Sequence, residues 1–199
     1  MEMLEPSTIN KLNNFIAGWY INNKTCDNLI TYFNNSPNKK PGILESNEVN
    51  KNYKVSTDLA IEFFNKDEPI NQYTLELNKV LNEYKKKYFF CDQGQPEWGI
   101  TEGFNIQEYK PKEGFLKYHT ERCSLKTCLR HLVFMTYLND IDDGGQTEFY
   151  YQKLKVKPKK GLTLIWSADW TFAHKGIVSP TQTKYITTGW FSYISKEKK

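Results

Sequence analysis

The chain has 199 residues, which is long enough for one domain with a buried core. Its net charge of +4 is carried mainly by lysine, whereas surfaces that read phosphates or bases ordinarily favour arginine, so we expect no nucleic-acid partner. No apolar run approaches the roughly 20 residues needed to cross a bilayer, so we expect no membrane span.

The start of the chain and its cysteines indicate a reducing compartment. Residues 1–6 contain neither a basic nor an apolar region, so we expect no signal peptide and a cytoplasmic protein. The four cysteines, Cys26, Cys91, Cys123 and Cys128, form no CxxC pair and are expected as thiols. A disulfide between Cys123 and Cys128 is the alternative interpretation. We expect a monomer or a weak homodimer.

Residues 1–98 are expected to form an N-terminal helical or irregular region that supports the rest of one integrated domain. Two stripes of apolar residues stand at helical spacing. The first predicts an early helix or helix-like lead-in, and the second predicts a helix: Ile9, Leu12, Phe15, Ile16 and Trp19, and then Cys26, Leu29, Ile30 and Phe33. Residues 23–25 are available to cap the second helix, which should end before Pro41 and Gly42. Residues 43–58 predict a polar, irregular connection.

The clearest predicted helix begins at residues 67–69. It has one long apolar stripe: Ile70, Tyr73, Leu77, Val80, Leu81, Tyr84 and Tyr88. Such a stripe is typical of a packing face, so we interpret this helix as a brace across one sheet. Residues 85–87, all lysine, are interpreted as its solvated C-terminal end, where cations complement the helix dipole.

From residue 99 onward the pattern changes to short strands separated by Gly, Pro and Asp turns, which is typical of a jelly roll. The predicted strands are 104–109, 116–121, 129–138, 147–151, 162–166, 172–174 and 184–193. The expected fold is therefore mainly β with flanking helices. Residues 99–199 would form a double-stranded β-helix (jelly-roll) catalytic core, with the N-terminal helices packed on one sheet.

Two histidines and a glutamate in this half suit a metal. His119 and Glu121 stand two positions apart in a predicted strand, so both side chains project to the same side and can grip one ion. His174 can supply a second imidazole. Two imidazoles and one carboxylate form the facial set of non-haem Fe(II) oxygenases, which leaves positions open for a co-substrate and O2.

A basic residue follows this set. A 2-oxo acid such as 2-oxoglutarate would chelate the metal at one end and would need a cation for its far carboxylate. Lys184 lies ten positions after His174, across a predicted turn at residues 176–181. The only arginines, Arg122 and Arg130, both precede His174. Lys184 is therefore the expected anchor.

Other residues could compete for these roles. His131 lies in an apolar predicted strand, where a hydrogen-bonded core or sheet-face histidine is the favoured interpretation. Asp142, Asp143 and Asp169 could each replace the carboxylate ligand, but turn chemistry accounts for them. Lys175 should point away from the pocket because neighbouring strand residues face opposite ways.

Several segments together resemble the Fe(II)- and 2-oxoglutarate-dependent dioxygenases, specifically the prolyl 4-hydroxylase group. They are residues 109–114 running into 119–121, residues 137–140, 144–149 and 156–161, and finally His174, Lys184 and Trp190. The resemblance is close over about the last hundred residues and weaker before them. The family usually has aspartate where this chain has Glu121.

The resemblance implies Fe(II), 2-oxoglutarate as co-substrate, and ascorbate as the reductant of oxidised iron. It implies hydroxylation of an unactivated C–H bond, with prolyl residues in a peptide or protein as the substrate. It also implies that Tyr109 and Thr147 line or hydrogen-bond the 2-oxoglutarate site and that Trp190 lies near the substrate side. A core aromatic is the alternative interpretation of Trp190.

Three other functions remain open or are disfavoured. An oxygenase of the same fold could act on lysyl residues, free amino acids or a small metabolite. A non-catalytic jelly-roll binding module is the alternative from another class. Alkylated-base demethylases share the iron site, but they anchor 2-oxoglutarate with arginine, and no arginine follows His174.

Overall fold

The computed structural model describes residues 4–44 and 48–195. Residues 1–3, 45–47 and 196–199 lie outside the described residues, and residues 45–47 belong to the expected irregular connection. In chain order the elements are η1 (Thr8–Lys11), β1 (Ala17–Tyr20), α1 (Asn23–Asn35), β2 (Lys40–Pro41), β3 (Lys54–Val55), β4 (Thr57–Ile61), α2 (Glu68–Lys87), η2 (Phe89–Cys91), β5 (Trp98–Gly99), β6 (Phe104–Tyr109), β7 (Gly114–Phe115), β8 (Arg130–Tyr137), β9 (Thr147–Phe149), β10 (Leu154–Val156), β11 (Leu162–Ser167), η3 (Trp170–Phe172), β12 (His174–Gly176) and β13 (Lys184–Tyr193).

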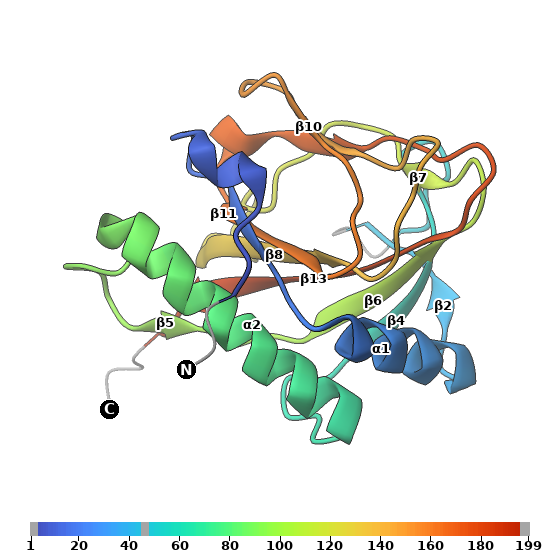
Figure 1. Cartoon of the computed structure of the whole chain (residues 1–199), viewed down its shortest axis with the longest axis horizontal. Helices are drawn as coiled ribbons and strands as arrows, with labels where there is room; N and C mark the ends of the chain where they lie inside the picture. The colour runs from blue at the N-terminus through green and yellow to red at the C-terminus, as the bar shows by residue number, and fades with distance from the viewer. Residues whose placement is uncertain (1–3, 45–47, 196–199) are drawn as a thin grey trace.

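The strands form a large and a small antiparallel sheet, as a jelly roll requires. The large sheet has the order β1-β11-β8-β13-β6-β4-β2, with β5 also paired to β13. The small sheet has the order β10-β9-β12, and β3 pairs with β7. In Figure 1, α1 and α2 lie on one side of the large sheet, whereas β10 and β7 lie on the other side. The predicted mainly β fold with helices on one sheet is confirmed.

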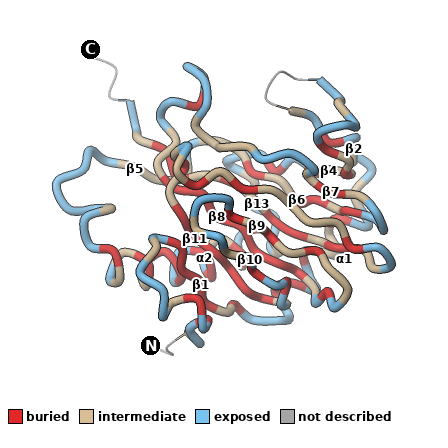
Figure 2. Tube along the Cα trace, turned by 90° about the horizontal axis from the view of Figure 1, so that it is seen from above, coloured by how far each residue is buried: buried red, intermediate tan, exposed pale blue. Residues whose placement is uncertain are grey.

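Alternating side chains of the large sheet contribute to two separate cores. In β8, Leu132 and Phe134 belong to a helix-side core together with residues of α1 and α2. Val133, Met135 and Tyr137 belong to an inter-sheet core together with residues of β9, β10 and β11. Successive strand residues point to opposite faces, so one strand fills both cores. Figure 2 shows the buried residues running along β8, β13 and β6.

Helix α2 is fastened to the large sheet as predicted. Its stripe from Ile70 to Tyr84 is buried, and Pro69 stands in its first turn. The hydroxyl of Tyr73 lies 3.0 Å from Thr136 Oγ1 and accepts a hydrogen bond of 2.6 Å from Thr187 Oγ1. A buried hydroxyl needs such partners. The helix thus braces the sheet through both apolar and polar contacts.

The helix predicted over residues 9–19 is wrong. Residues 8–11 form only a 3-10 turn, and residues 17–20 are the edge strand β1, which pairs with β11. Phe15 has a φ of 63°, a left-handed conformation that ends any helix at that point. Pairing with β11 therefore outweighs the local helical spacing. The second helix is confirmed, but its cap is Asn22, whose side chain accepts a hydrogen bond from the Lys24 amide.

Other predicted boundaries differ from the structure as well, among them the end of the predicted strand 147–151, which stops at Phe149. Residues 54–55 and 57–61 are strands rather than part of an irregular connection. Within the predicted strand 116–121, only His119 pairs, through an isolated bridge to His174. Residues 170–172 form a 3-10 turn, and the strand begins at His174 and not at residue 172.

Strand β13 runs unbroken from residue 184 to 193, but its pairing with β8 contains a register shift. The pairing passes from Phe191↔Leu132 directly to Ser192↔Arg130, so His131 is an extra residue in β8. An extra residue reverses the alternation of side chains beyond it. Arg130 consequently points to the opposite face from Leu132.

Two further expectations concern membranes and cysteines. Neither helix of the described chain combines the length and the apolar character that spanning a bilayer demands. In the part of the chain that the structure describes, no disulfide joins any of the four cysteines.

Candidate metal centre and co-substrate pocket

The structure brings His119, Glu121 and His174 together at the end of the inter-sheet core. One ligand atom from each residue lies within 4.8 Å of the others. Glu121 Oε1 lies 3.5 Å from Nε2 of His119 and 3.4 Å from Nε2 of His174. The two histidines are also joined by reciprocal backbone hydrogen bonds of 2.9 and 3.0 Å. This bridge fixes the spacing of the two imidazoles.

The remaining nitrogen of each ring is held by a backbone carbonyl. Nδ1 of His119 donates to the Lys117 carbonyl at 3.2 Å, and Nδ1 of His174 donates to the Phe172 carbonyl at 2.9 Å. A carbonyl can only accept, so in the neutral ring Nε2 keeps its lone pair and points toward Glu121. The ring of Phe115 stacks on His119, with centroids 3.6 Å apart. This arrangement is typical of metal-binding histidines.

The charges of the cluster suit a divalent cation. Burial lowers the pKa of His119, and the neighbouring His174 lowers it further, so that ring is neutral at pH 7. Burial opposes ionisation of Glu121, but the two histidines outweigh it and hold the pKa of the carboxyl well below its ordinary value. Two imidazole nitrogens and one carboxylate oxygen that face a common point form the ligand set that Fe(II) oxygenases use. The residues present therefore fit Fe(II).

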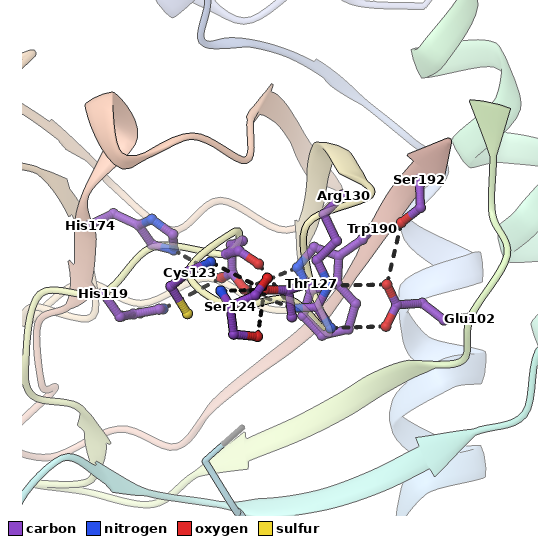
Figure 3. Close-up of polar contacts among 10 residues, drawn as sticks. Glu102, His119, Cys123, Ser124, Thr127, Arg130, His174, Trp190 and Ser192 are labelled. Atoms are coloured by element: carbon purple, nitrogen blue, oxygen red, sulfur yellow. Dashed lines mark hydrogen bonds and ion pairs between the residues drawn. The ribbon is translucent and has the colours of Figure 1, made fainter. Parts of the chain in front are cut away.

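The second oxygen of Glu121 is held from the opposite side. Nε1 of Trp190 donates to Oε2 at 3.0 Å, and Nη1 of Arg130 lies 3.8 Å from the same oxygen. Arg130 is fixed in turn by a two-pronged ion pair with Glu102, and Figure 3 shows this chain of contacts leading to the histidines. Trp190 thus lies against the Glu121 carboxylate. Sequence reasoning missed Arg130 and Glu102.

Lys184 is the first residue of β13, and its side chain lies beside Tyr109 of the inter-sheet core. It is 4% exposed, and among the described residues its ammonium donates one hydrogen bond, of 3.1 Å, to the Gly145 carbonyl. Across the described chain, no carboxylate lies within ion-pair distance of this ammonium. Burial lowers the pKa of Lys184 to about 8. A buried cation without an acidic partner is a good receptor for the carboxylate of a ligand.

Tyr109 and Thr147 line the same region of the inter-sheet space. Tyr109 lies opposite Lys184 in the pairing of β6 with β13, and its hydroxyl donates to Gln107 Oε1 at 2.8 Å. The Thr147 hydroxyl accepts a hydrogen bond of 2.6 Å from the Tyr137 hydroxyl. Both side chains are buried. The Tyr109 ring contacts the Lys184 ammonium, and Thr147 follows two residues after Gly145, whose carbonyl accepts the hydrogen bond from Lys184.

The competing residues lie elsewhere. His131 is hydrogen-bonded through Nε2 to the Cys91 carbonyl and through Nδ1 to Tyr193, as expected for a structural histidine. Asp169 pairs with Arg122. Lys175 pairs with Glu148 and lies over the ring of Tyr118, on the outer face of the small sheet.

Asp143 also serves a turn. Its carboxylate accepts hydrogen bonds from Ser179 and from the backbone and hydroxyl of Thr181. These bonds lower the pKa of Asp143. The turn between β12 and β13, which returns the chain to Lys184, is thereby held against the loop that precedes β9.

Comparison with known proteins identifies the part of the chain that holds the candidate site. The model of the 2OG-Fe(II) oxygenase superfamily matches residues 104–192. This range contains the three candidate ligands and Lys184. Comparison of the sequence with curated proteins gives no significant match.

Several solved structures share the fold at low sequence identity. A viral collagen prolyl hydroxylase from Paramecium bursaria Chlorella virus-1, in a 2OG complex, is 19% identical, with a TM-score of 0.68, over 92% of this chain and 98% of that chain. A prolyl-4-hydroxylase from Pseudomonas putida is 15% identical, with a TM-score of 0.69, over 92% and 95% of the two chains. A prolyl hydroxylase from Trichoplax adhaerens, in complex with a peptide fragment of the hypoxia inducible factor oxygen degradation domain, is 16% identical, with a TM-score of 0.72, over 90% and 84%.

Proposed function

We propose that this chain is a dioxygenase of the 2OG-Fe(II) oxygenase superfamily, whose model matches residues 104–192, and that it hydroxylates prolyl residues in a peptide. One observation carries the proposal. The His119–Glu121–His174 cluster and the buried, unpaired ammonium of Lys184 lie in one inter-sheet space, among the described residues. A metal cluster alone would suit many functions, whereas this pairing suits a co-substrate with a carboxylate at its far end.

His119, Glu121 and His174 would hold Fe(II) in this chain. The chemistry that Fe(II) supplies when bound is the activation of O2, by which 2-oxoglutarate loses CO2 to become succinate and a C–H bond of the substrate becomes C–OH. The carbonyls of Lys117 and Phe172 keep the two imidazoles turned toward the ion.

The remaining residues position the co-substrate and exclude water. Lys184 would receive the far carboxylate of 2-oxoglutarate through a charge-assisted hydrogen bond, and Tyr109 and Thr147 would line its path. Aromatic rings also surround one of the candidate ligands: Phe149 and Trp166 both pack against His174, with centroids 5.6 and 5.1 Å from it. Apolar side chains lower the local dielectric constant and so strengthen the electrostatic interactions of the cluster.

The substrate class rests on the structural relatives. The three solved structures described above are prolyl hydroxylases, and one of them holds a peptide. We therefore extend the proposal to a proline-containing peptide or protein as partner. Ascorbate as reductant and a cytoplasmic location are proposed from the sequence alone.

Succinate release tests the enzyme proposal, and mass spectrometry tests the substrate. The purified protein would be reconstituted with Fe(II) under anaerobic conditions, and 2-oxoglutarate, O2, ascorbate and a panel of proline-rich peptides would then be added. We expect succinate together with a gain of one oxygen atom on proline. Succinate without peptide oxidation would overturn the substrate class, and no succinate at all would favour a binding module.

A further inference from the structure

The two oxygens of Glu121 have different surroundings. Oε1 faces both imidazoles, at 3.5 and 3.4 Å, whereas Oε2 accepts the hydrogen bond from Trp190. An oxygen that accepts a hydrogen bond from an indole N–H has one lone pair fewer to offer a metal and is held in a fixed direction. The carboxylate is therefore presented edge-on, with one oxygen toward the cluster.

The partner of Oε2 is itself held in place. The guanidinium of Arg130 lies 3.4 Å from the centroid of the Trp190 ring, within stacking distance, and donates from Nη1 to the backbone carbonyl of Glu121 at 3.1 Å. Glu102 binds the same guanidinium through two hydrogen bonds of 3.0 and 2.9 Å. Ser192 Oγ in turn donates to Glu102. Figure 3 shows these side chains in one continuous layer beside the histidines.

The direction of Arg130 depends on the extra residue in β8. Regular alternation would place Arg130 on the helix side with Leu132. The skipped pairing at His131 turns it to the other face, where it meets Trp190 and the backbone of Glu121. The strand irregularity and the contacts to Glu121 thus belong to one arrangement.

We propose that Trp190 and Arg130 are positioning residues that fix Glu121 as a ligand through one oxygen only, so that the rest of the metal's coordination sphere stays open to the co-substrate. The proposal rests on the proposed function, because it requires a metal at the cluster. Its chemical content is specific. Without the indole N–H, Oε2 is free to rotate inward, and the carboxylate then either binds through both oxygens or loses its fixed direction.

Metal affinity tests the proposal without turnover. Mn(II) binding would be measured by calorimetry for the wild type, Trp190→Phe, Glu121→Asp and the double variant. Phenylalanine preserves the ring but removes the N–H, and aspartate shortens the reach by one methylene. Contacts that orient a ligand typically contribute 10–100-fold to metal affinity, so each single variant should bind Mn(II) at least tenfold more weakly. The loss of Mn(II) affinity in the double variant should be smaller than the product of the two single losses, because both changes break the same contact.

Trp98→Phe is the matched control. Trp98 also carries a cation over its ring, Lys85 at 4.3 Å, but its Nε1 has no hydrogen-bond partner in the described chain and it lies away from the cluster. The Mn(II) affinity of the Trp98→Phe variant should equal that of the wild type.

Arg130→Lys tests the second positioning residue. This substitution keeps the charge but removes the two-pronged contact with Glu102, so it should cause an intermediate loss of Mn(II) affinity.

The visible spectrum of the Co(II)-substituted protein gives a second readout. A change from one bound carboxylate oxygen to two alters the coordination number, so Trp190→Phe should change the band intensities and Trp98→Phe should not. If the wild type binds no Mn(II), the proposed function itself fails. If the wild type binds Mn(II) and Trp190→Phe matches it in affinity and spectrum, the positioning role is refuted while the proposed function stands.

Discussion

Lys184 and Tyr109 face each other across the β13–β6 pair, and the ammonium of Lys184 lies 4.9 Å from the centroid of the tyrosine ring. The ring and the Gly145 carbonyl are weak substitutes for the water that burial removes. The pKa of Lys184 accordingly falls to about 8, from an ordinary value of 10.5. The protein thus holds a cation at a cost in stability, which a bound carboxylate would offset.

Replacing Lys184 with methionine should raise stability and remove co-substrate binding. A pKa lowered from 10.5 to about 8 corresponds to roughly 3 kcal/mol at pH 7. Because the folded-state pKa lies below the unfolded one, the unfolded chain binds more protons between pH 8 and 10.5, and wild-type stability rises with pH across this window. The advantage of Lys184→Met should therefore shrink from pH 8 to 10.5. Urea unfolding at several pH values and 2-oxoglutarate titration check both effects.

Lys54→Met is the control for that variant. Lys54 is also buried, but its ammonium lies 2.6 Å from a carboxylate oxygen of Asp58. Removing it leaves Asp58 without its cation, so stability should fall by about 2 kcal/mol or more at pH 7. Equal and negative effects of the two substitutions would contradict the view that Lys184 is held for a ligand.

The affinity for 2-oxoglutarate should fall above pH 8. The ammonium form of Lys184 binds a carboxylate, and a pKa of about 8 leaves about one tenth of it at pH 9. The dissociation constant of 2-oxoglutarate, measured without catalytic turnover, should therefore rise about tenfold from pH 7 to pH 9. Calorimetry across this range, with Mn(II) present, measures it, and a constant affinity would exclude Lys184 as the anchor.

His174 and His131 should respond differently to substitution by alanine. His174→Ala removes one ligand of the cluster and should lower succinate release by at least a hundredfold. His131→Ala removes hydrogen bonds to Cys91 and Tyr193 and should lower stability by about 1–3 kcal/mol while leaving most of the release intact. The reverse pattern would show that His131, and not His174, binds the metal.

Gly144→Ala should weaken both the fold and the pocket. Gly144 has a φ of 130°, and an added Cβ would lie 2.4 Å from the Val178 carbonyl oxygen. A strained backbone conformation costs about 1–3 kcal/mol, and the clash adds to it. Because the next residue provides the carbonyl that Lys184 contacts, 2-oxoglutarate affinity should fall too.

Gly94→Ala separates the two causes. Gly94 also has a positive φ, of 72°, but an added Cβ meets nothing within 4 Å. The Gly94→Ala variant should lose only about 1–2 kcal/mol of stability, and its affinity for 2-oxoglutarate should be unchanged. Thermal unfolding compares the two variants, and equal losses would mean that the contact with Val178 relaxes without cost.

The strands that carry the site could be predicted because their patterns are strong. Residues 104–109 and 184–193 have the predicted limits, since β-rich runs there are bounded by turn residues. The sequence predicts that His119, Glu121 and His174 lie together, but strand spacing is not the reason, because Glu121 lies outside any strand and the two histidines meet through a long-range bridge.

Other features had no local signal. The spacing of Ile9, Ile16 and Trp19 indicates a helix, yet Ile9 lies in a 3-10 turn, Trp19 lies in an edge strand, and Ile16 lies between these elements; all three side chains are buried. The Glu102–Arg130 ion pair joins residues 28 positions apart, and nothing in either segment reveals it. The extra residue at His131 could not be seen either, because a strand irregularity is defined by the partner strand.

The uninterrupted run of β13 between Lys184 and Trp190 also limits how this chain can change in length. Six positions separate the two residues, an even number, so both side chains emerge on the cluster side of the sheet. Inserting or deleting a single residue between them would turn one of the two toward α2 and would disconnect either the anion receptor or the support of Glu121. The exposed turn at residues 150–153 carries no such parity requirement, so length variation should be far better tolerated there.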